Sequence, residues 1–250
     1  MDISQYLARI QVGAPISIDL TSLTKLQTAH LKAVPFENLD IHYGKHITLD
    51  VERFFEKIVI NKRGGFCYEI NGLFHALLCK LGFNAKIISA STSREDGGFA
   101  EEYNHLAIVV TIDGVDYLVD AGFGRFAVTP LQIGTDSLMF DGIAKYQITK
   151  HDGDYFMVSR VEAGGDAPEY IFTLTERRLD EFTEMCEFQQ TSPDSHFTQN
   201  KIISILKDYG RITLTNTQLK ILRHEGLEIA DFEEDQFEKY LAQYFDIKLS

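Results

Sequence analysis

The sequence predicts an α+β protein, because two kinds of hydrophobic pattern occupy different parts of the chain. Up to about residue 85 the apolar residues recur at helical spacing, and from Ala85 onward short runs rich in β-branched and aromatic residues follow one another. After about Gln190 the pattern is mixed. Helices first, strands in the middle and a mixed end are typical of an α+β fold.

The first part of the chain is expected to be helical. A loose helical period covers residues 20–31 and stops at Val34-Pro35, because a residue that precedes proline avoids the α region. A second helix is predicted around residues 51–60. The clearest helix carries one apolar stripe at offsets 0, 3, 4, 7, 8 and 11, formed by Ile70, Leu73, Phe74, Leu77, Leu78 and Leu81. Gly82 follows where a C-cap glycine belongs.

The middle of the chain predicts an antiparallel sheet or barrel. The candidate strands are KIISAS, NHLAIVVTI, VDYLVDA, KYQITK, DYFMVSR and EYIFTL. Asp113-Gly114 and Asp152-Gly153 are turn dipeptides of the kind that join two strands of a hairpin. In the last part, RITLTNTQLKIL is expected to form strands and the acidic stretch DFEEDQFEKYLAQYF a final helix.

Composition and charge exclude several classes of protein. With 250 residues, 44% of them hydrophobic and 24% charged, the chain is ordinary for a globular protein. The formal net charge of −13 argues against broad nucleic-acid binding, which needs a basic surface. No apolar run approaches the ~20 residues that span a bilayer, and the acidic N-terminus lacks the pattern of a signal peptide. We expect a cytoplasmic protein that binds neither nucleic acid nor a membrane.

Neither the cysteines nor the histidines indicate a metal site. Cys67, Cys79 and Cys186 are an odd number with no CxxC spacing, so neither a disulfide framework nor a zinc ribbon is expected. His42 and His46 are four residues apart, but Gly44 between them weakens a helical metal pair. We therefore expect reduced thiols and no bound metal.

Cys67 is the candidate nucleophile. It stands in KRGGFCYEINGLF, directly after a Gly-Gly pair and at the start of the clearest predicted helix. The helix dipole and the unpaired N–H groups of the first turn favour a thiolate there, and the thiolate is the reactive form. The alternative is a small apolar residue that fills a seam between helix and sheet, and position alone does not decide between the two.

The predicted hairpin brings a candidate base and a carboxylate together. If Asp113-Gly114 is a two-residue turn, His105 faces Gly122 and Asp120 faces Ala107, so that His105 and Asp120 are diagonal neighbours on one face. A slip of one residue would place Asp120 on the opposite face. The alternative is two solvated residues, but an unpaired carboxylate in this apolar part of a strand would be costly to bury. Gly122 opposite His105 would leave room for a substrate.

These motifs resemble those of the arylamine N-acetyltransferases. VPFENLDIHYGK, RGGFCYEINGLF, NHLAIVV, YLVDAGFG and TSPDSHF match the family in order and spacing, over nearly the whole chain, and RGGFCYE together with PFENL is highly specific. The resemblance implies a helical bundle over residues 1–85, an antiparallel β-barrel over residues 86–190 and an α/β lid over residues 191–250. A Cys-His-Asp triad like that of thiol proteases would lie between the first two parts.

The resemblance also implies roles for the residues of the triad. Cys67 matches the nucleophile of the family, His105 its base and Asp120 the carboxylate that orients the base. Arg63 and Glu69 of RGGFCYE are expected to be structural supports, as an ion pair that holds the cysteine loop.

Other matching positions concern the two substrates. Phe36 and Phe123 match positions where the family places aromatic walls around the acceptor. Gly124 and Arg125 belong to the GFGR loop beside the cleft that binds acetyl-CoA, and glycines there suggest backbone N–H groups open to an anionic ligand.

The function implied by the resemblance is transfer of an acetyl group from acetyl-CoA to an arylamine or hydrazine, by a ping-pong mechanism through acetyl-Cys67. An aromatic site with no obvious carboxylate would suit an amine that is uncharged at pH 7. The alternatives are an amide synthase with a larger acyl substrate, a thiol protease or transglutaminase-like hydrolase, and a binding module with an idle triad. An intact Cys, His and Asp argues against the last.

Overall fold

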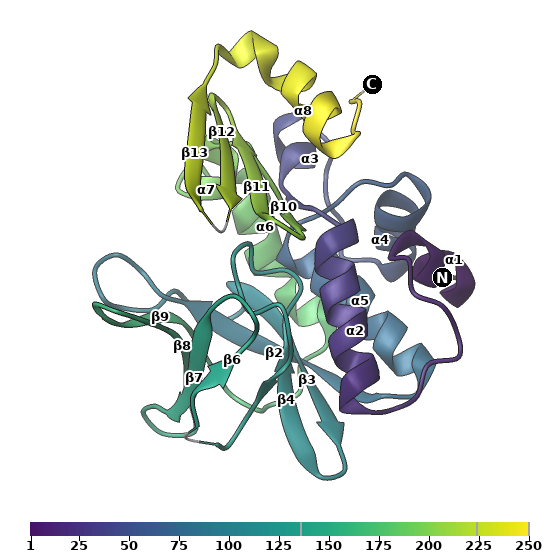
Figure 1. Cartoon of the computed structure of the whole chain (residues 1–250), viewed down its shortest axis with the longest axis vertical. Helices are drawn as coiled ribbons and strands as arrows, with labels where there is room; N and C mark the ends of the chain where they lie inside the picture. Colours follow the sequence, from purple (N-terminus) through teal and green to yellow (C-terminus); the bar gives the residue numbers. More distant parts are fainter. Residues whose placement is uncertain (136, 224, 250) are drawn as a thin grey trace.

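The computed structural model describes residues 1–135, 137–223 and 225–249, and it confirms an α+β fold. Helices of the N-terminal part pack beside a curled antiparallel sheet, and a second, smaller sheet with the last helix lies at the other end of the molecule (Figure 1). The boundaries of the three parts, at residues 85 and 190, stay a prediction. Among the described residues no helix is both long and apolar enough to cross a lipid bilayer.

The N-terminal part is helical, as its periodicity predicts. The predicted helix at 51–60 is an α-helix that continues into one π-helical segment, and the longest helix begins at Cys67. Gly82 caps that helix in the left-handed conformation, with φ 98°, as predicted. The elements are α1 (Ile3–Arg9), α2 (Leu20–Ala33), β1 (Phe36–Glu37), α3 (Leu39–His42), α4 (Val51–Phe55), η1 (Glu56–Ile60) and α5 (Cys67–Leu81).

The central sheet is antiparallel throughout, with the order β5-β4-β3-β2-β9-β8-β7-β6. Strand β5 at one end of the order also contacts β7 near the other end, so that the sheet curls into a nearly closed barrel. The strands are β2 (Asn84–Thr92), β3 (His105–Ile112), β4 (Val115–Val119), β5 (Leu131–Gln132), β6 (Met139–Phe140), β7 (Lys145–Lys150), β8 (Phe156–Glu162) and β9 (Gly165–Phe172).

The register of the β3–β4 hairpin is the one that the turn dipeptide predicts. The residues on either side of Asp113-Gly114 pair directly, and the ladder runs without interruption to the last residue of β4. Asp120 is the first residue beyond that strand, and His105 is the first residue of β3. The hairpin therefore carries the two polar side chains at its open end, away from the turn.

The C-terminal part forms a second antiparallel sheet, with the order β1-β10-β11-β12-β13. The predicted strands around residues 211–222 and the predicted final helix are confirmed, whereas α6, α7, β10 and β13 have no counterpart in the sequence analysis. The elements are η2 (Leu179–Phe182), α6 (Thr183–Thr191), α7 (His196–Gln199), β10 (Ile202–Lys207), β11 (Gly210–Thr215), β12 (Gln218–Arg223), β13 (Gly226–Asp231), η3 (Glu234–Gln236) and α8 (Phe237–Phe245).

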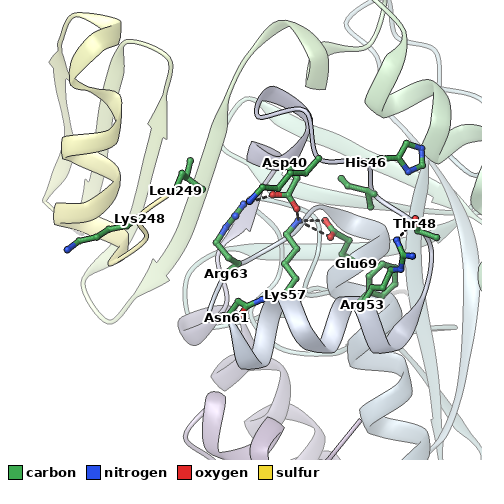
Figure 2. Close-up of a pocket in the computed structure, with 13 residues that line it drawn as sticks. Asp40, His46, Thr48, Arg53, Lys57, Asn61, Arg63, Glu69, Lys248 and Leu249 are labelled. Carbon is green, nitrogen blue, oxygen red and sulfur yellow. Dashed lines mark hydrogen bonds and ion pairs between the residues drawn. The ribbon is translucent and has the colours of Figure 1, made fainter.

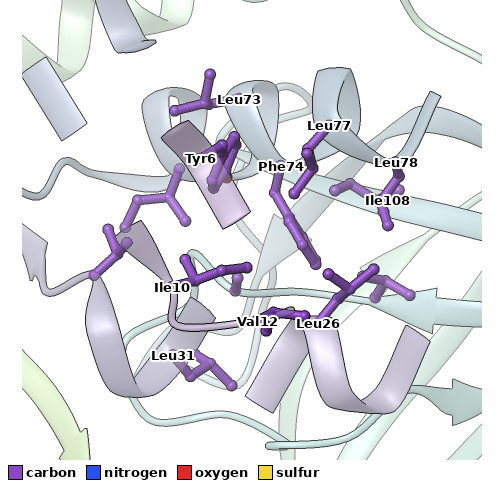
Figure 3. Packing of buried hydrophobic residues seen from close by; sticks show 14 of the residues in the cluster. Tyr6, Ile10, Val12, Leu26, Leu31, Leu73, Phe74, Leu77, Leu78 and Ile108 are labelled. Carbon is purple, nitrogen blue, oxygen red and sulfur yellow. The ribbon is translucent and has the colours of Figure 1, made fainter. Parts of the chain in front are cut away.

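Helix α5 and strand β3 form the centre of the core. The apolar stripe of α5 is fully buried except for Leu81, which is partly buried. Phe74 and Leu77 pack with Tyr6 and Leu26 of the neighbouring helices and with Ile108 of β3 (Figure 3). Alternate residues of β3 face the other way and join the interior of the barrel. Because β3 is buried on both faces, its position relative to α5 is fixed by packing on either side.

Candidate active site

Cys67 is the first residue of α5, where the sequence places it. Its side chain is 3% exposed. Burial raises the pKa of the Cys67 thiol well above its ordinary value, and backbone hydrogen bonds at Leu106 and Tyr68 act in the opposite direction without outweighing it. The first turn of α5 therefore favours the thiolate, as expected, but the cost of desolvating the charge is larger.

The side chains of His105 and Asp120 meet as the hairpin register predicts. Nε2 of His105 lies 2.7 Å from Oδ2 of Asp120, and the two residues are 2% and 1% exposed. The hydroxyl of Tyr170 donates to the same Asp120 oxygen at 3.1 Å. Because Asp120 engages Nε2, the other ring nitrogen, Nδ1, is the one available to a neighbouring group.

Asn71 connects the helix of Cys67 to both strands of the hairpin. It lies one turn beyond Cys67 on α5, and its Nδ2 donates to Oδ1 of Asp120 at 2.8 Å and to the carbonyl oxygen of Leu106 at 2.6 Å. Its Oδ1 accepts from the backbone N–H of Ala121 at 2.9 Å. Asn71 is not among the predicted site residues, although an amide within an apolar helix, four residues after a candidate nucleophile, is a usable signal.

Gly122 is the point of closest approach between the hairpin and α5. Its N–H donates to Oδ1 of Asp120 at 2.9 Å. A Cβ atom at this position would lie 3.0 Å from Cα of Cys67 and 2.9 Å from Nδ2 of Asn71. Gly122 also lines a cavity beside Cys67 and His105, so the expectation that it leaves room for a substrate stays a prediction.

A cavity of about 370 Å³ opens beside Cys67 and His105. Four other predicted site residues also line this cavity, namely Phe36, Phe123, Gly124 and Arg125. Asp120 lies behind His105 and does not line it. Further lining residues that the sequence analysis misses come from the barrel and from the C-terminal part, namely Thr92, Asn104, Glu169, Gln189, His196, Phe197 and Ile202. The TSPDSHF motif contains His196 and Phe197 and is the signal that could have identified these two residues.

The cavity contains a carboxylate that the sequence analysis did not predict, that of Glu169. The sequence suggests a site with no obvious carboxylate, but the Glu169 side chain lines the cavity and is 16% exposed. Strand-forming runs such as EYIFTL do not reveal which of their residues will face a cavity.

The expected ion pair between Arg63 and Glu69 does not form. Arg63 instead bonds Glu37 at 2.8 Å and Asp40 at 3.0 Å, and Glu69 bonds Lys57 at 2.8 Å. Lys57 also bonds Asp40 at 2.8 Å and so joins the two pairs into one buried network, which forms part of the wall of a second cavity of about 480 Å³ (Figure 2).

The network supports the first turn of α5. Oε2 of Glu69 accepts from the backbone N–H of Phe66, the residue before Cys67, at 3.2 Å. Three carboxylates around Lys57 raise its pKa, and burial raises the pKa of Glu69 to about 7. The positive charge of Lys57 therefore compensates the buried carboxylates of Glu37, Asp40 and Glu69.

The described residues include no group of three or more His, Cys, Asp or Glu side chains that could hold a metal ion. Instead, a buried thiol and a histidine line the same cavity, and one ring nitrogen of the histidine contacts a buried carboxylate. Such an arrangement can generate a sulfur nucleophile by transfer of the thiol proton to the imidazole.

Substitution Gly122→Ala tests the close approach of the hairpin to α5. We expect a loss of about 1–3 kcal/mol in the free energy of unfolding, because the added methyl group overpacks against the backbone of Cys67. Gly164→Ala is the matched control, since among the described residues, its two chain neighbours aside, no heavy atom lies within 4 Å of a Cβ there. Urea denaturation measures both variants, and equal stability of the two would contradict the packing described.

Substitution Lys57→Met tests the buried network. At pH 8 we expect a loss of about 3–5 kcal/mol in the free energy of unfolding, because the buried carboxylate of Glu69 loses the cation that binds it and Asp40 retains Arg63. Without Lys57 the pKa of Glu69, which burial already raises to about 7, rises further, and the pKa of Asp40, which Lys57 helps to hold low, rises as well. The folded variant therefore binds more protons than the folded wild type and recovers stability as the pH falls. The loss should therefore be smaller at pH 5.5.

The same urea titrations on Lys25→Met, which removes an exposed lysine of α2, provide the control. They should match the wild type at both pH values. A Lys57→Met variant whose deficit is the same at pH 8 and pH 5.5 would contradict the electrostatic role of Lys57.

Comparison with known proteins places the chain in a family. A family model described as N-acetyltransferase matches residues 19–250. The pineal gland arylamine N-acetyltransferase isozyme NAT-10 of Gallus gallus is 32% identical over 100% of this chain and 95% of its own length. Arylamine N-acetyltransferase 1 of Homo sapiens is 31% identical over 100% of this chain and 95% of its own length.

Solved structures agree with this placement. An arylamine N-acetyltransferase of Mycobacterium smegmatis superposes with a TM-score of 0.92 at 30% identity, over 100% of this chain and 93% of its own. An arylamine N-acetyltransferase of Bacillus cereus, which has a Cys-His-Glu catalytic triad, shares the fold with a TM-score of 0.91 at 23% identity, over 100% of both chains. The chain belongs to the arylamine N-acetyltransferase family and is an acyltransferase.

Proposed function

We propose that this enzyme transfers the acetyl group of acetyl-CoA to an arylamine or arylhydrazine through an acetyl-Cys67 intermediate, with Cys67, His105 and Asp120 as its catalytic triad. The observation that carries the proposal is the 2.7 Å contact between His105 and Asp120 beside a cavity lined by Cys67 and His105. Family membership supports the acetyl transfer itself.

The first step is ionisation of the thiol. Burial raises the pKa of Cys67, so an isolated thiolate is unfavourable there. Transfer of the proton to Nδ1 of His105 gives a thiolate and an imidazolium, and the Asp120 carboxylate stabilises the positive ring. The pair of charges costs less than a lone thiolate because the two ions attract each other.

The acyl group then moves in two transfers. The Cys67 sulfur attacks the thioester carbon of acetyl-CoA, the bond to the CoA sulfur breaks, and His105 returns its proton to the departing CoA thiolate. The amine next attacks acetyl-Cys67, His105 takes a proton from the amine nitrogen, and the Cys67 sulfur leaves. The N–H of Cys67, in the first turn of α5, is a candidate donor to the oxyanion of both intermediates.

The cavity offers different walls to the two substrates. Gly124 and the exposed Arg125 lie in the loop after Asp120, where backbone N–H groups and a guanidinium suit the anionic CoA. Phe36 and Phe123 supply flat apolar surface for an aryl ring. The Phe123 ring also contacts the His105 ring edge-on, at 5.0 Å between centroids, which supports an aryl site next to the base.

Intact mass spectrometry after brief exposure to acetyl-CoA, without amine, tests the proposed intermediate. We expect the wild type to gain one acetyl group, which an arylamine then removes, because a ping-pong mechanism stores the acetyl group on Cys67. Cys67→Ala should gain none. Cys79→Ala is the control for chemical acetylation of an exposed thiol and should behave as the wild type does.

Acetylation that persists in Cys67→Ala would contradict the assignment of the nucleophile. A wild type that remains unmodified by acetyl-CoA but is acylated by a longer acyl-CoA would instead favour an amide synthase that uses a larger acyl substrate.

A further inference from the structure

Glu169 is a carboxylate in the proposed active-site cavity that the mechanism does not use. It lies on β9 immediately before Tyr170, whose hydroxyl binds Asp120. Its carbonyl oxygen accepts from the N–H of Ser93 at 2.9 Å, which holds its backbone against the end of β2. A side chain held on a barrel strand presents its carboxylate at a fixed place in the cavity wall.

The Glu169 carboxylate has little to satisfy it within the described part of the chain. Nε of Arg160 lies 3.8 Å from its Oε1, beyond hydrogen-bond distance, and that Nε has no hydrogen-bond partner among the described residues. Arg160 directs its NH2 group to Glu162 instead, at 2.8 Å. A partly buried carboxylate with unused lone pairs gains from any ligand that donates to it.

The groups around Glu169 shift its pKa in both directions. Burial is the main cause that raises its pKa, with smaller contributions from Glu162 and Asp120, whereas Arg160 and Arg125 lower it. A cationic or N–H group of a substrate would add to the two arginines and compensate the desolvation of the carboxylate.

The neighbouring wall of the cavity is polar as well. Thr92 and Asn104 line the same cavity, and the Thr92 hydroxyl donates to the Asn104 side-chain oxygen at 2.6 Å. Thr92 pairs with Tyr170 across β2 and β9, which places it beside Glu169. The barrel therefore contributes a polar wall with a negative charge, whereas Phe36 and Phe197 contribute aromatic surface to the same cavity.

We propose that Glu169 determines acceptor specificity by binding a second nitrogen group of the acceptor, an ammonium or an N–H donor on the aryl ring, while the first nitrogen is acetylated. The enzyme then favours arylamines with such a substituent over arylamines that carry a carboxylate. This inference rests on the proposed function, because it concerns the acceptor that discharges acetyl-Cys67.

The variant Glu169→Gln, which keeps the size of the side chain and removes its charge, tests the proposal. The measurement is the rate at which 4-aminobenzylamine, a cation at neutral pH, and 4-aminobenzoate, an anion, discharge pre-formed acetyl-enzyme. We expect the variant to lose about tenfold or more with the cation, as for a charged hydrogen bond, and to gain with the anion. Acetylation by acetyl-CoA should keep its wild-type rate, which also shows that the variant is folded.

Glu162→Gln is the matched control. It removes the other carboxylate that contacts Arg160, on the exposed side of β8, without altering the lining of the cavity. It should keep the wild-type ratio of the two discharge rates.

An unchanged ratio in Glu169→Gln overturns the proposal, as does an equal shift in both variants or a change confined to the acetylation step. A wild type that forms no acetyl-enzyme is a separate result, since it overturns the proposed function and this inference together.

Discussion

The structure of the site depends on the buried carboxylate of Asp120. It receives hydrogen bonds from four donors, the His105 ring, the Tyr170 hydroxyl, the Asn71 amide and the N–H of Gly122. These donors come from β3, β9, α5 and the loop that carries Asp120 itself. An unpaired carboxylate in this position would be costly, so the same bonds that satisfy the charge fix the helix of Cys67 against the strand of His105.

A second buried network of charged side chains supports the chain next to Cys67. Lys57 joins Asp40 and Glu69, and Glu69 in turn accepts from the N–H of the residue before Cys67. The first turn of α5 is thus held through Asn71 on one side and through Glu69 on the other. Both arrangements are satisfied only when α5 and its neighbours are in place, which couples the folding of the helical part to the geometry of the site.

The features that could be predicted from the sequence are the local ones. The turn at Asp113-Gly114 determines the register of β3 and β4, and that register is sufficient to bring His105 to Asp120. The start of α5 at Cys67 follows in the same way from an apolar stripe and a Gly-Gly pair. Patterns within a dozen residues fix these features, because helix periodicity and turn type are local properties.

The features that escaped prediction depend on contacts between distant segments. Strand β1 pairs with β10 near the other end of the chain, and α6 and α7 bring Gln189, His196 and Phe197 to the cavity. Neither helix periodicity nor turn type specifies either contact.

Glu169 escaped because the register of β8 and β9 shifts at Val158, which changes the face that later residues present. Arg63 had several acidic residues within reach, and spacing alone could not choose among them.

The proposed mechanism requires Asp120, acting through His105, to make the buried Cys67 reactive. Alkylation of Cys67 by iodoacetamide, followed over pH by mass spectrometry of the Cys67 peptide in the wild type and in Asp120→Asn, tests it most directly. Because burial alone raises the pKa of the thiol, the account predicts rapid alkylation near pH 7 only in the wild type. In Asp120→Asn the rate should rise only above the ordinary pKa of a thiol, and identical profiles for the two proteins would contradict the account.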